Sequence, residues 1–312
     1  MLRDIAMFVG GSCCVWLGAE GMVRGSVKLA AWLGIPSMIV GLTLVAFGTS
    51  APELVVSAVA SYRGLGEIAL GNVIGSNIIN IGLVLGLSAI IAPMAVRPEA
   101  LRREMPVLVG VTIVVALMAV LGESLGRADG VLLIALFLGY TLLCYRLAVA
   151  ERQRVTRIPG WERPALSWFH VFFLVAGTVV LALGAEGMVR GAVGVAEALG
   201  VSQRVIAVIL VAFGTSLPEL AASAVAARHG ESDLALGNVI GSNICNMTFI
   251  LGTAALIRPL PTSITWRSEY MIFFVAMVLV LVPMARIRWR VGRIDGMILL
   301  AMYALAVTLL IA

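Results

Sequence analysis

Hydrophobic positions along this chain come in long blocks, separated by short charged segments and by segments that contain Gly or Pro. Blocks of about 20 apolar residues are long enough to cross a bilayer as helices. The pattern predicts an all-α membrane protein with ten transmembrane helices, at residues 4–24, 36–62, 69–92, 104–122, 128–147, 168–190, 202–228, 235–257, 268–285 and 293–311. The most polar stretch is too short for a folded domain. We therefore expect five helices in residues 1–147, a cytoplasmic linker at 148–167 and five helices in 168–312.

One segment of the chain occurs twice. Residues 18–91 align with residues 184–257 without a gap, at an offset of 166. The first apolar run resembles a signal peptide, but it ends in the octamer GAEGMVRG, which recurs in mid-chain. We therefore expect it to be a membrane helix. Five helices per copy is an odd number, so the second copy enters the membrane from the opposite side. Secondary transporters are often built from such inverted repeats, with the binding site at the midplane between them.

Composition supports a membrane protein and excludes an ordinary soluble domain. The 312 residues are 61% hydrophobic and 12% charged, whereas soluble chains carry about 25% charged residues. The net charge of +5 comes almost entirely from Arg, which gathers in the cytoplasmic loops of membrane proteins, so we expect no nucleic acid partner. With both termini outside, fifteen of the 22 Lys and Arg residues lie on the inner side. We expect a multi-pass protein of a prokaryotic cell membrane with extracytoplasmic termini.

Side chains that bind zinc or copper are few and isolated. The cysteines lack the paired spacing of a zinc site, and neither histidine has a partner nearby in the sequence. They are Cys13, Cys14, Cys144, Cys245, His170 and His229. We expect no cofactor and no enzymatic activity. The octamers each place a Glu four residues before an Arg, a spacing that favours an ion pair at a helix end.

Each copy carries one carboxylate inside a membrane helix, at Glu53 in GTSAPEL and at Glu219 in GTSLPEL. A charge inside the bilayer is costly and marks a functional site by default. Thr49 and Ser50 are four and three residues before Glu53, so the three side chains share one helix face. Thr215 and Ser216 repeat this pattern.

A proline stands one residue before each of these glutamates, at Pro52 and Pro218. Proline has no N–H and clashes with the carbonyl one turn earlier, so we expect a kink and free carbonyls just before it, around residues 46–49. The preceding half-helix also points its negative dipole end into the break. The result is an oxygen-rich site for cations.

The third helix of each copy adds polar side chains. Ser76 and Asn80 are four residues apart and face the same way, as do Ser242 and Asn246. We expect these four to line the site. For the other asparagines we favour hydrogen bonding and packing between helices; they are Asn72, Asn77, Asn238 and Asn243.

Hard oxygen ligands without Cys or His select Na⁺, Ca²⁺ or Mg²⁺. Two carboxylates neutralise one Ca²⁺, and two bidentate Glu side chains with two main-chain carbonyls would supply six ligands. Several Na⁺ could share the same oxygens. Protons could also satisfy the carboxylates, so a proton cycle stays open.

Two copies of G-T-S-x-P-E-L, each followed by G-N-V-I-G-S-N-I-x-N, resemble the α-repeats of the sodium/calcium exchanger family, especially its short prokaryotic members. The resemblance implies ten helices in two inverted halves that alternate access by sliding the first and sixth helices. It implies that Glu53 and Glu219 bridge Ca²⁺ together with the main-chain oxygens of Thr49 and Thr215. It also implies flanking Na⁺ sites and polar residues around the cluster, formed by Ser50, Ser76, Ser216, Ser242, the carbonyls of Ala46 and Ala212, and Asn80 and Asn246.

Asn246 is a departure, because some family members carry Asp there. A third carboxylate is then missing from the site. We expect an antiporter that exports Ca²⁺ as Na⁺ enters, with membrane lipid as its surroundings and no required protein partner. A Ca²⁺/H⁺ antiporter that uses the same carboxylates and a cation channel remain as alternatives. K⁺ dependence, ion stoichiometry and oligomeric state stay open.

Overall fold

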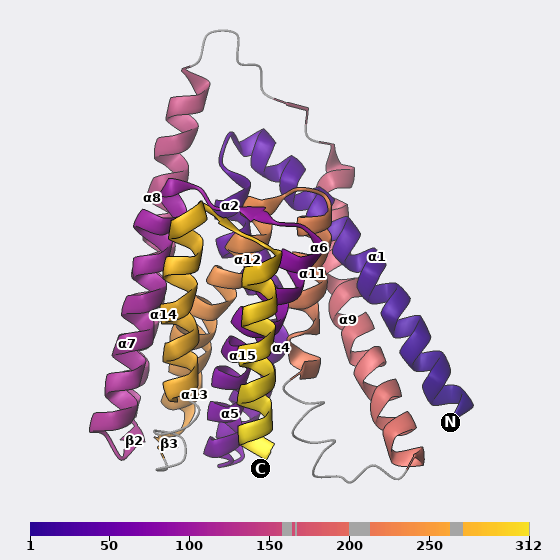
Figure 1. Cartoon of the computed structure of the whole chain (residues 1–312), viewed down its shortest axis with the longest axis vertical. Helices are drawn as coiled ribbons and strands as arrows, with labels where there is room; N and C mark the ends of the chain where they lie inside the picture. The colour runs from indigo at the N-terminus through magenta and orange to yellow at the C-terminus, as the bar shows by residue number, and fades with distance from the viewer. Residues whose placement is uncertain (158–163, 166, 200–212, 263–270, 312) are drawn as a thin grey trace.

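The computed structural model describes residues 1–157, 164–165, 167–199, 213–262 and 271–311, and these are mostly helical (Figure 1). The α-helices are α1 (Leu2–Leu33), α2 (Ser37–Val40), α3 (Ala46–Thr49), α4 (Ala51–Tyr62), α5 (Gly66–Ile79), α6 (Gly86–Ile91), α7 (Met105–Leu121), α8 (Arg127–Thr156), α9 (Trp168–Ala198), α11 (Leu217–Arg228), α12 (Ser232–Cys245), α13 (Leu251–Ile257), α14 (Met271–Arg288) and α15 (Arg293–Ile311). The π-helical segments are η1 (Gly41–Val45), η2 (Asn80–Leu85), η3 (Ala100–Glu104) and η4 (Asn246–Ile250). The short strands are β1 (Met94–Ala95), β2 (Ser124–Leu125), β3 (Leu260–Pro261) and β4 (Arg290–Val291).

Within the described residues, seven helical segments are long and apolar enough to cross a membrane, and the bent pair at Ser37–Thr49 and Ala51–Tyr62 makes an eighth. The expected helices at 202–228 and 268–285 lie partly outside the described residues. Helix α8 continues to Thr156, so the first part of the segment predicted as the linker, residues 148–156, is helical. Its last turns, AERQRVT, contain good helix formers such as Ala, Glu, Arg and Gln, which extend the helix beyond its apolar part.

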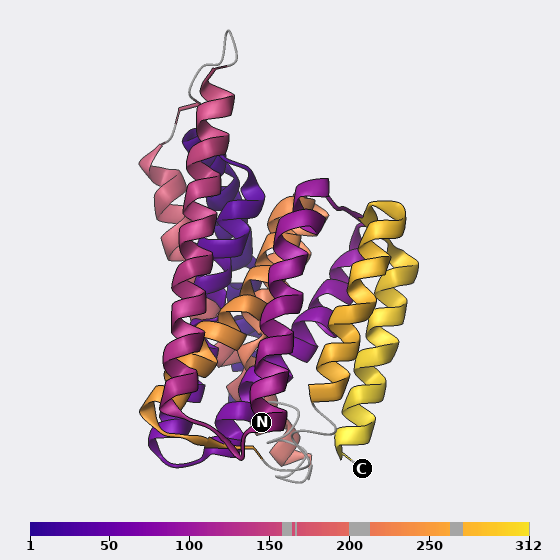
Figure 2. The ribbon, with the colours of Figure 1, turned by 90° about the vertical axis from the view of Figure 1, so that its left-hand side faces the viewer.

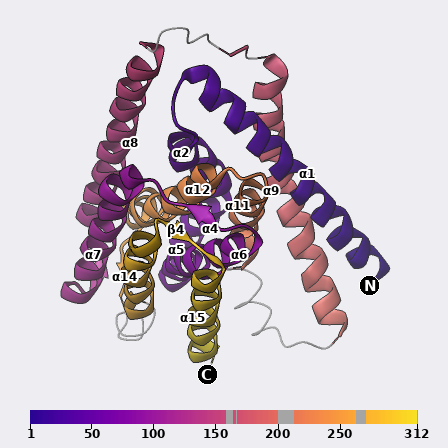
Figure 3. The same ribbon diagram turned by 45° about the horizontal axis from the view of Figure 1, so that its top comes forward.

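Helices α1 and α9 lie side by side at one edge of the molecule, while α7 and α8 lie at the other edge (Figure 1). Figure 2 shows α14 and α15 packed together on a further side. The central helices are the most covered: in an apolar stretch of 18 residues within each helix, 72% of the residues are buried in Gly66–Ile91 and 78% in Ser232–Ile257. The corresponding shares for α1 and α9 are only 28% and 22%. Figure 3 shows α4, α5, α11 and α12 in the middle of the bundle.

A seam of glycines joins α1 to α9. Along α1, Gly11 faces Met188, while Gly25, farther along the helix, faces Leu174, so the two helices run antiparallel. A Cβ atom at Gly18 would lie 2.7 Å from the carbonyl oxygen of Gly177. That distance is too short for any side chain, so glycine lets the two backbones touch.

Two short antiparallel ribbons pair strands from different copies. Strand β1 pairs with β4, and β2 pairs with β3. Strands β2 and β3 lie at the lower end of the molecule in Figure 1, and the chain segment carrying β4 lies at the upper end. Since β1 and β3, like β2 and β4, are 166 residues apart, equivalent strands lie at opposite ends of the molecule.

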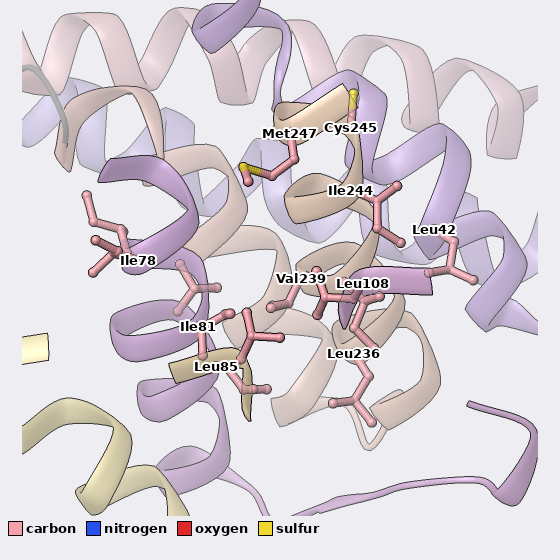
Figure 4. Close-up of a cluster of buried hydrophobic side chains, with 14 of the residues drawn as sticks. Leu42, Ile78, Ile81, Leu85, Leu108, Leu236, Val239, Ile244, Cys245 and Met247 are labelled. Carbon is pink, nitrogen blue, oxygen red and sulfur yellow. The ribbon is translucent and has the colours of Figure 1, made fainter. Parts of the chain in front are cut away.

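The central helices are held together by apolar side chains that fill the spaces between them. Ile78 and Ile81 project from the α5–η2 segment, and Val239 and Ile244 project from α12, into one buried cluster (Figure 4). Each of these four side chains is at most 3% exposed. This apolar packing holds α5, η2 and α12 together in the middle of the molecule.

Candidate cation-binding site

The helix that carries Glu53 breaks at Ser50, where the axis bends by 47°. The predicted kink is therefore confirmed. Pro52 lies in the first turn of α4, where its missing N–H is tolerated because first-turn N–H groups have no partner within the helix. Pro218 occupies the same place in α11. Each proline thus begins a new helix whose first turn also holds a glutamate.

The two glutamates are completely buried and meet between the copies. The Ser50 hydroxyl donates a hydrogen bond to Glu219 Oε1 at 2.8 Å. The Ser216 hydroxyl donates to Glu53 Oε1 at 3.2 Å. Each carboxylate is therefore held by a serine from the other copy, and the four residues form one cluster as the sequence pattern predicted.

Ser76, Asn80, Ser242 and Asn246 are fully buried. None of their side-chain polar atoms has a hydrogen-bond partner in the part of the chain that the structure describes. Asn80 is the first residue of η2, and Asn246 is the first residue of η4. π-helical segments often occur at functional sites. The sequence pattern did not reveal them, although both copies place one at the same position.

One further oxygen of each glutamate, Oε2 of Glu53 and Oε2 of Glu219, also lacks a partner among the described residues. A buried polar atom without a partner costs about 1–3 kcal/mol, and more when it is charged. The elements that carry these atoms pack against one another across the two copies, since η2 contacts α11 and η4 contacts α4. An arrangement of two carboxylates, two hydroxyls and two amide oxygens fits Na⁺ or Ca²⁺, which prefer hard oxygen ligands.

Asn72 and Asn238, expected to serve in packing, are fully hydrogen-bonded. Asn72 Nδ2 donates to the Glu53 carbonyl at 3.1 Å and to Ser57 Oγ at 2.9 Å. Asn72 Oδ1 accepts from the Thr215 hydroxyl at 3.3 Å. Asn238 makes the same three contacts with Glu219, Ser223 and Thr49.

The main chain before the break differs in part from expectation. The Ala46 carbonyl accepts a hydrogen bond from the Ser50 N–H at 3.0 Å, so the prediction that it loses its helical partner is wrong. The Thr49 hydroxyl lies 3.0 Å from the Val45 carbonyl as well as 3.2 Å from Asn238 Oδ1. Ala212 lies outside the described residues.

The described residues contain no group of three or more His, Cys, Asp and Glu side chains that could hold a metal. The charge at the candidate site therefore comes from Glu53 and Glu219, and its other predicted ligands are neutral oxygens. All four cysteines are free thiols.

The octamers form the expected ion pairs, but the prediction that these lie at a helix end is wrong, because α1 continues to Leu33 and α9 continues to Ala198. Glu20 Oε1 lies 2.5 Å from Arg24 Nη2, and Glu186 Oε1 lies 2.6 Å from Arg190 Nε. Sequence reasoning missed one further contact: His229 Nε2, in the turn between α11 and α12, lies 2.9 Å from Glu20 Oε1. No pattern along the chain could link residues so far apart.

Comparison with known proteins agrees with this geometry. The chain matches the sodium/calcium exchanger protein family over residues 4–146 and 169–312. It is 37% identical over 308 residues to the putative antiporter CaxA of Alkalimonas amylolytica, covering 96% of each chain. It is 31% identical over 292 residues to the sodium/calcium exchanger MaX1 of Methanosarcina acetivorans, covering 80% of this chain and 82% of that one. A solved structure of the sodium-calcium exchanger NCX_Mj, soaked with Na⁺ and Sr²⁺, matches with a TM-score of 0.86 and 35% identity over 98% of each chain.

Proposed function

We propose that this chain, which belongs to the sodium/calcium exchanger family, exports Ca²⁺ in exchange for entering Na⁺ by alternating access. The observation that carries the proposal is the buried cluster of oxygens without protein partners around Glu53 and Glu219. A cation is the partner that these oxygens lack. The family and its transporter character argue against a catalytic enzyme.

Coupling in this proposal arises from competition for the same oxygens. Glu53 and Glu219 bridge Ca²⁺ with the main-chain oxygens of Thr49 and Thr215. Na⁺ ions bind the same carboxylates and the flanking oxygens, so the two kinds of ion exclude each other. The flanking oxygens are those of Ser50, Ser76, Ser216, Ser242, Asn80, Asn246, Ala46 and Ala212.

The charge of the occupied site decides whether the exchange can use the membrane potential. Against two carboxylates, one Ca²⁺ leaves the site neutral, whereas three Na⁺ give it a charge of +1. One net charge per cycle is worth about 2.3 kcal/mol at 100 mV. A three-for-one exchange would therefore use the membrane potential to extrude Ca²⁺, whereas a two-for-one exchange would not.

We further propose that the protein has ten membrane helices in two inverted halves, with residues 148–167 as a linker on the cytoplasmic side and both termini outside. The antiparallel course of α1 and α9 and the placement of equivalent strands at opposite ends support the inversion. The Arg-rich inner loops support the orientation. The membrane is the prokaryotic inner membrane.

Flux through purified protein in proteoliposomes tests the exchange. Outward gradients of Na⁺, K⁺ and H⁺ are imposed one at a time while Ca²⁺ uptake is followed. We expect uptake with the Na⁺ gradient alone. Uptake driven by a pH gradient without Na⁺ would favour Ca²⁺/H⁺ exchange, for which the unpartnered Glu53 Oε2 and Glu219 Oε2 offer proton sites. A Ca²⁺ current that needs no counter-ion would indicate a channel.

A further inference from the structure

Asn72 and Asn238 each complete a closed ring of contacts that crosses from one copy to the other. In the first ring, Asn72 donates to the Glu53 carbonyl and accepts from the Thr215 hydroxyl. Thr215 precedes Ser216 in the chain, and the Ser216 hydroxyl donates back to the Glu53 carboxylate. The ring therefore contains the backbone and the carboxylate of one glutamate and the broken helix of the other copy.

The second ring repeats this arrangement with the copies exchanged. Asn238 donates to the Glu219 carbonyl at 3.4 Å and lies 3.2 Å from the Thr49 hydroxyl. Ser50, which follows Thr49, donates to the Glu219 carboxylate. The single proton of the Thr49 hydroxyl is shared between Asn238 and the Val45 carbonyl one turn earlier. The two rings together connect both glutamates to both helix breaks.

The other asparagines on these helices do not form such rings. Asn77 donates to the Val73 carbonyl at 2.6 Å, and Asn243 donates to the Val239 carbonyl at 2.7 Å, each one turn back in its own helix. The amide side chain of asparagine combines two N–H donors with a carbonyl acceptor and carries no charge. Asn72 and Asn238 use both functions, one within their own copy and the other across the interface.

We infer that Asn72 and Asn238 are positioning residues that set the Ca²⁺ affinity of the site by fixing Thr215 and Thr49 relative to the two glutamates. This inference rests on the proposed function. Ca²⁺ needs its oxygens at about 2.3–2.6 Å, and the main-chain oxygens of both threonines are proposed ligands. When a threonine loses its hydrogen bond to the asparagine, its main-chain carbonyl oxygen can move beyond this distance from the ion.

A double-mutant cycle on Asn72 and Thr215 tests the inference. Thr215→Val removes the donor but keeps the side-chain volume and the main-chain oxygen, and Asn72→Ala removes the acceptor. Ca²⁺ binding to purified protein in detergent is measured, together with the half-saturating Ca²⁺ concentration and the maximal rate in proteoliposomes. Loss of one buried hydrogen bond corresponds to about a tenfold change, so we expect the Ca²⁺ Kd to rise about tenfold in each variant. Asn72→Ala also removes the bonds to the Glu53 carbonyl and to Ser57. Since Thr215 acts on Asn72 through one bond, the double variant should bind no more weakly than Asn72→Ala alone.

Ser57→Ala is the matched control. It removes the other partner of Asn72 Nδ2, which lies within the same copy, so it should lower the melting temperature while leaving Ca²⁺ affinity unchanged. Equal shifts of Kd in Ser57→Ala and Asn72→Ala would overturn the inference, because helix packing would explain both. Additive effects in the cycle, or an unchanged Kd in Thr215→Val, would overturn it as well.

Two further results keep this test separate from the test of the proposed function. If wild-type protein does not bind Ca²⁺, the proposed function itself fails. If wild-type protein binds Ca²⁺ and the variants bind it equally well, only the positioning role fails. Should Asn72→Ala not fold, Thr215→Val and Thr49→Val address the two rings without changing either asparagine.

Discussion

The two copies of the octamer GAEGMVRG have the same sequence but lie in different surroundings. The Glu20 side chain is 19% exposed and contacts both Arg24 and His229. The Glu186 side chain is 60% exposed, and among the described residues it pairs with Arg190. The position equivalent to His229 in the first copy is Arg63. The octamer therefore adopts one local structure, and its tertiary partner differs between the copies.

The centre of the molecule is nearly symmetric in comparison. Ser50 and Ser216 each bond the glutamate of the other copy, and the π-helical segments η2 and η4 both begin at an asparagine. The difference between the copies thus lies along α1 and α9, while the proposed ligands among the described residues keep matching positions. A site that binds ions from each side of a membrane in turn is expected to have symmetric ligands. The asymmetry of any one conformation is then expected elsewhere in the molecule.

The largest expected effect comes from changing either central carboxylate. Glu53→Gln and Glu219→Gln should each reduce Na⁺-driven Ca²⁺ flux by about a hundredfold or more, because removing one partner of a buried charge interaction costs about 3–5 kcal/mol. The exposed Glu67, on α5, is the matched control, and Glu67→Gln should transport normally. Normal flux from either central variant would contradict the site assignment, and unequal losses would show that the centre is less symmetric than its contacts.

The glycine seam should give the next largest effect. Gly184→Ala places a Cβ 2.7 Å from the Val15 N atom, so the α1–α9 contact must open. Overpacking of this kind typically costs about 1–3 kcal/mol, and we expect a lower melting temperature and about tenfold slower exchange. Gly10→Ala, on the open side of α1, has no atom within 4 Å of its Cβ and should change neither quantity. Equal behaviour of the two variants would show that close contact along the seam is unimportant.

A smaller effect is expected when the symmetry of the centre is broken directly. Asn246→Asp adds a third carboxylate at the start of η4, where both side-chain atoms of Asn246 lack partners among the described residues. We expect the protein to fold, with the pH or Na⁺ dependence of Ca²⁺ flux changed several-fold. Asn80→Asp is the matched variant in the other copy. An unchanged profile in both would mean that these positions do not tune coupling.

The smallest effect concerns the contact between Glu20 and His229. His229 Nε2 lies 2.9 Å from Glu20 Oε1, and the two side chains are 40% and 19% exposed. Exposed pairs are worth about 1 kcal/mol or less, so His229→Ala should change the exchange rate by about two- to threefold. Arg24, Lys28, His170 and Glu231 line the same cavity of about 660 Å³, so the rate is compared with that of Glu20→Gln. Equal rates in wild type and both variants would exclude a role for this contact.

Much of the fold and of the candidate site could be predicted because the relevant signals are local or repeated. The length of the apolar runs predicted the helices. The constant offset between the two copies indicated that Glu53 and Glu219 belong to one site. Other features depend on contacts between distant segments. The rings through Asn72 and Asn238 cross between copies, and the contact of His229 with Glu20 spans most of the chain. The π-helical segments change backbone bonding without changing the apolar pattern, so no sequence periodicity marks η2 or η4.

The antiparallel course of α1 and α9 has an electrical consequence. A helix carries the equivalent of about half a positive charge at its N-terminus and half a negative charge at its C-terminus. In two touching antiparallel helices these macrodipoles oppose each other and nearly cancel, and the paired Glu and Arg of each octamer add no net charge. A displacement of this pair as one body across the membrane field would therefore do little electrical work. The voltage dependence of transport would then reflect the charges of the ions and of the two buried glutamates, and not the dipoles of α1 and α9.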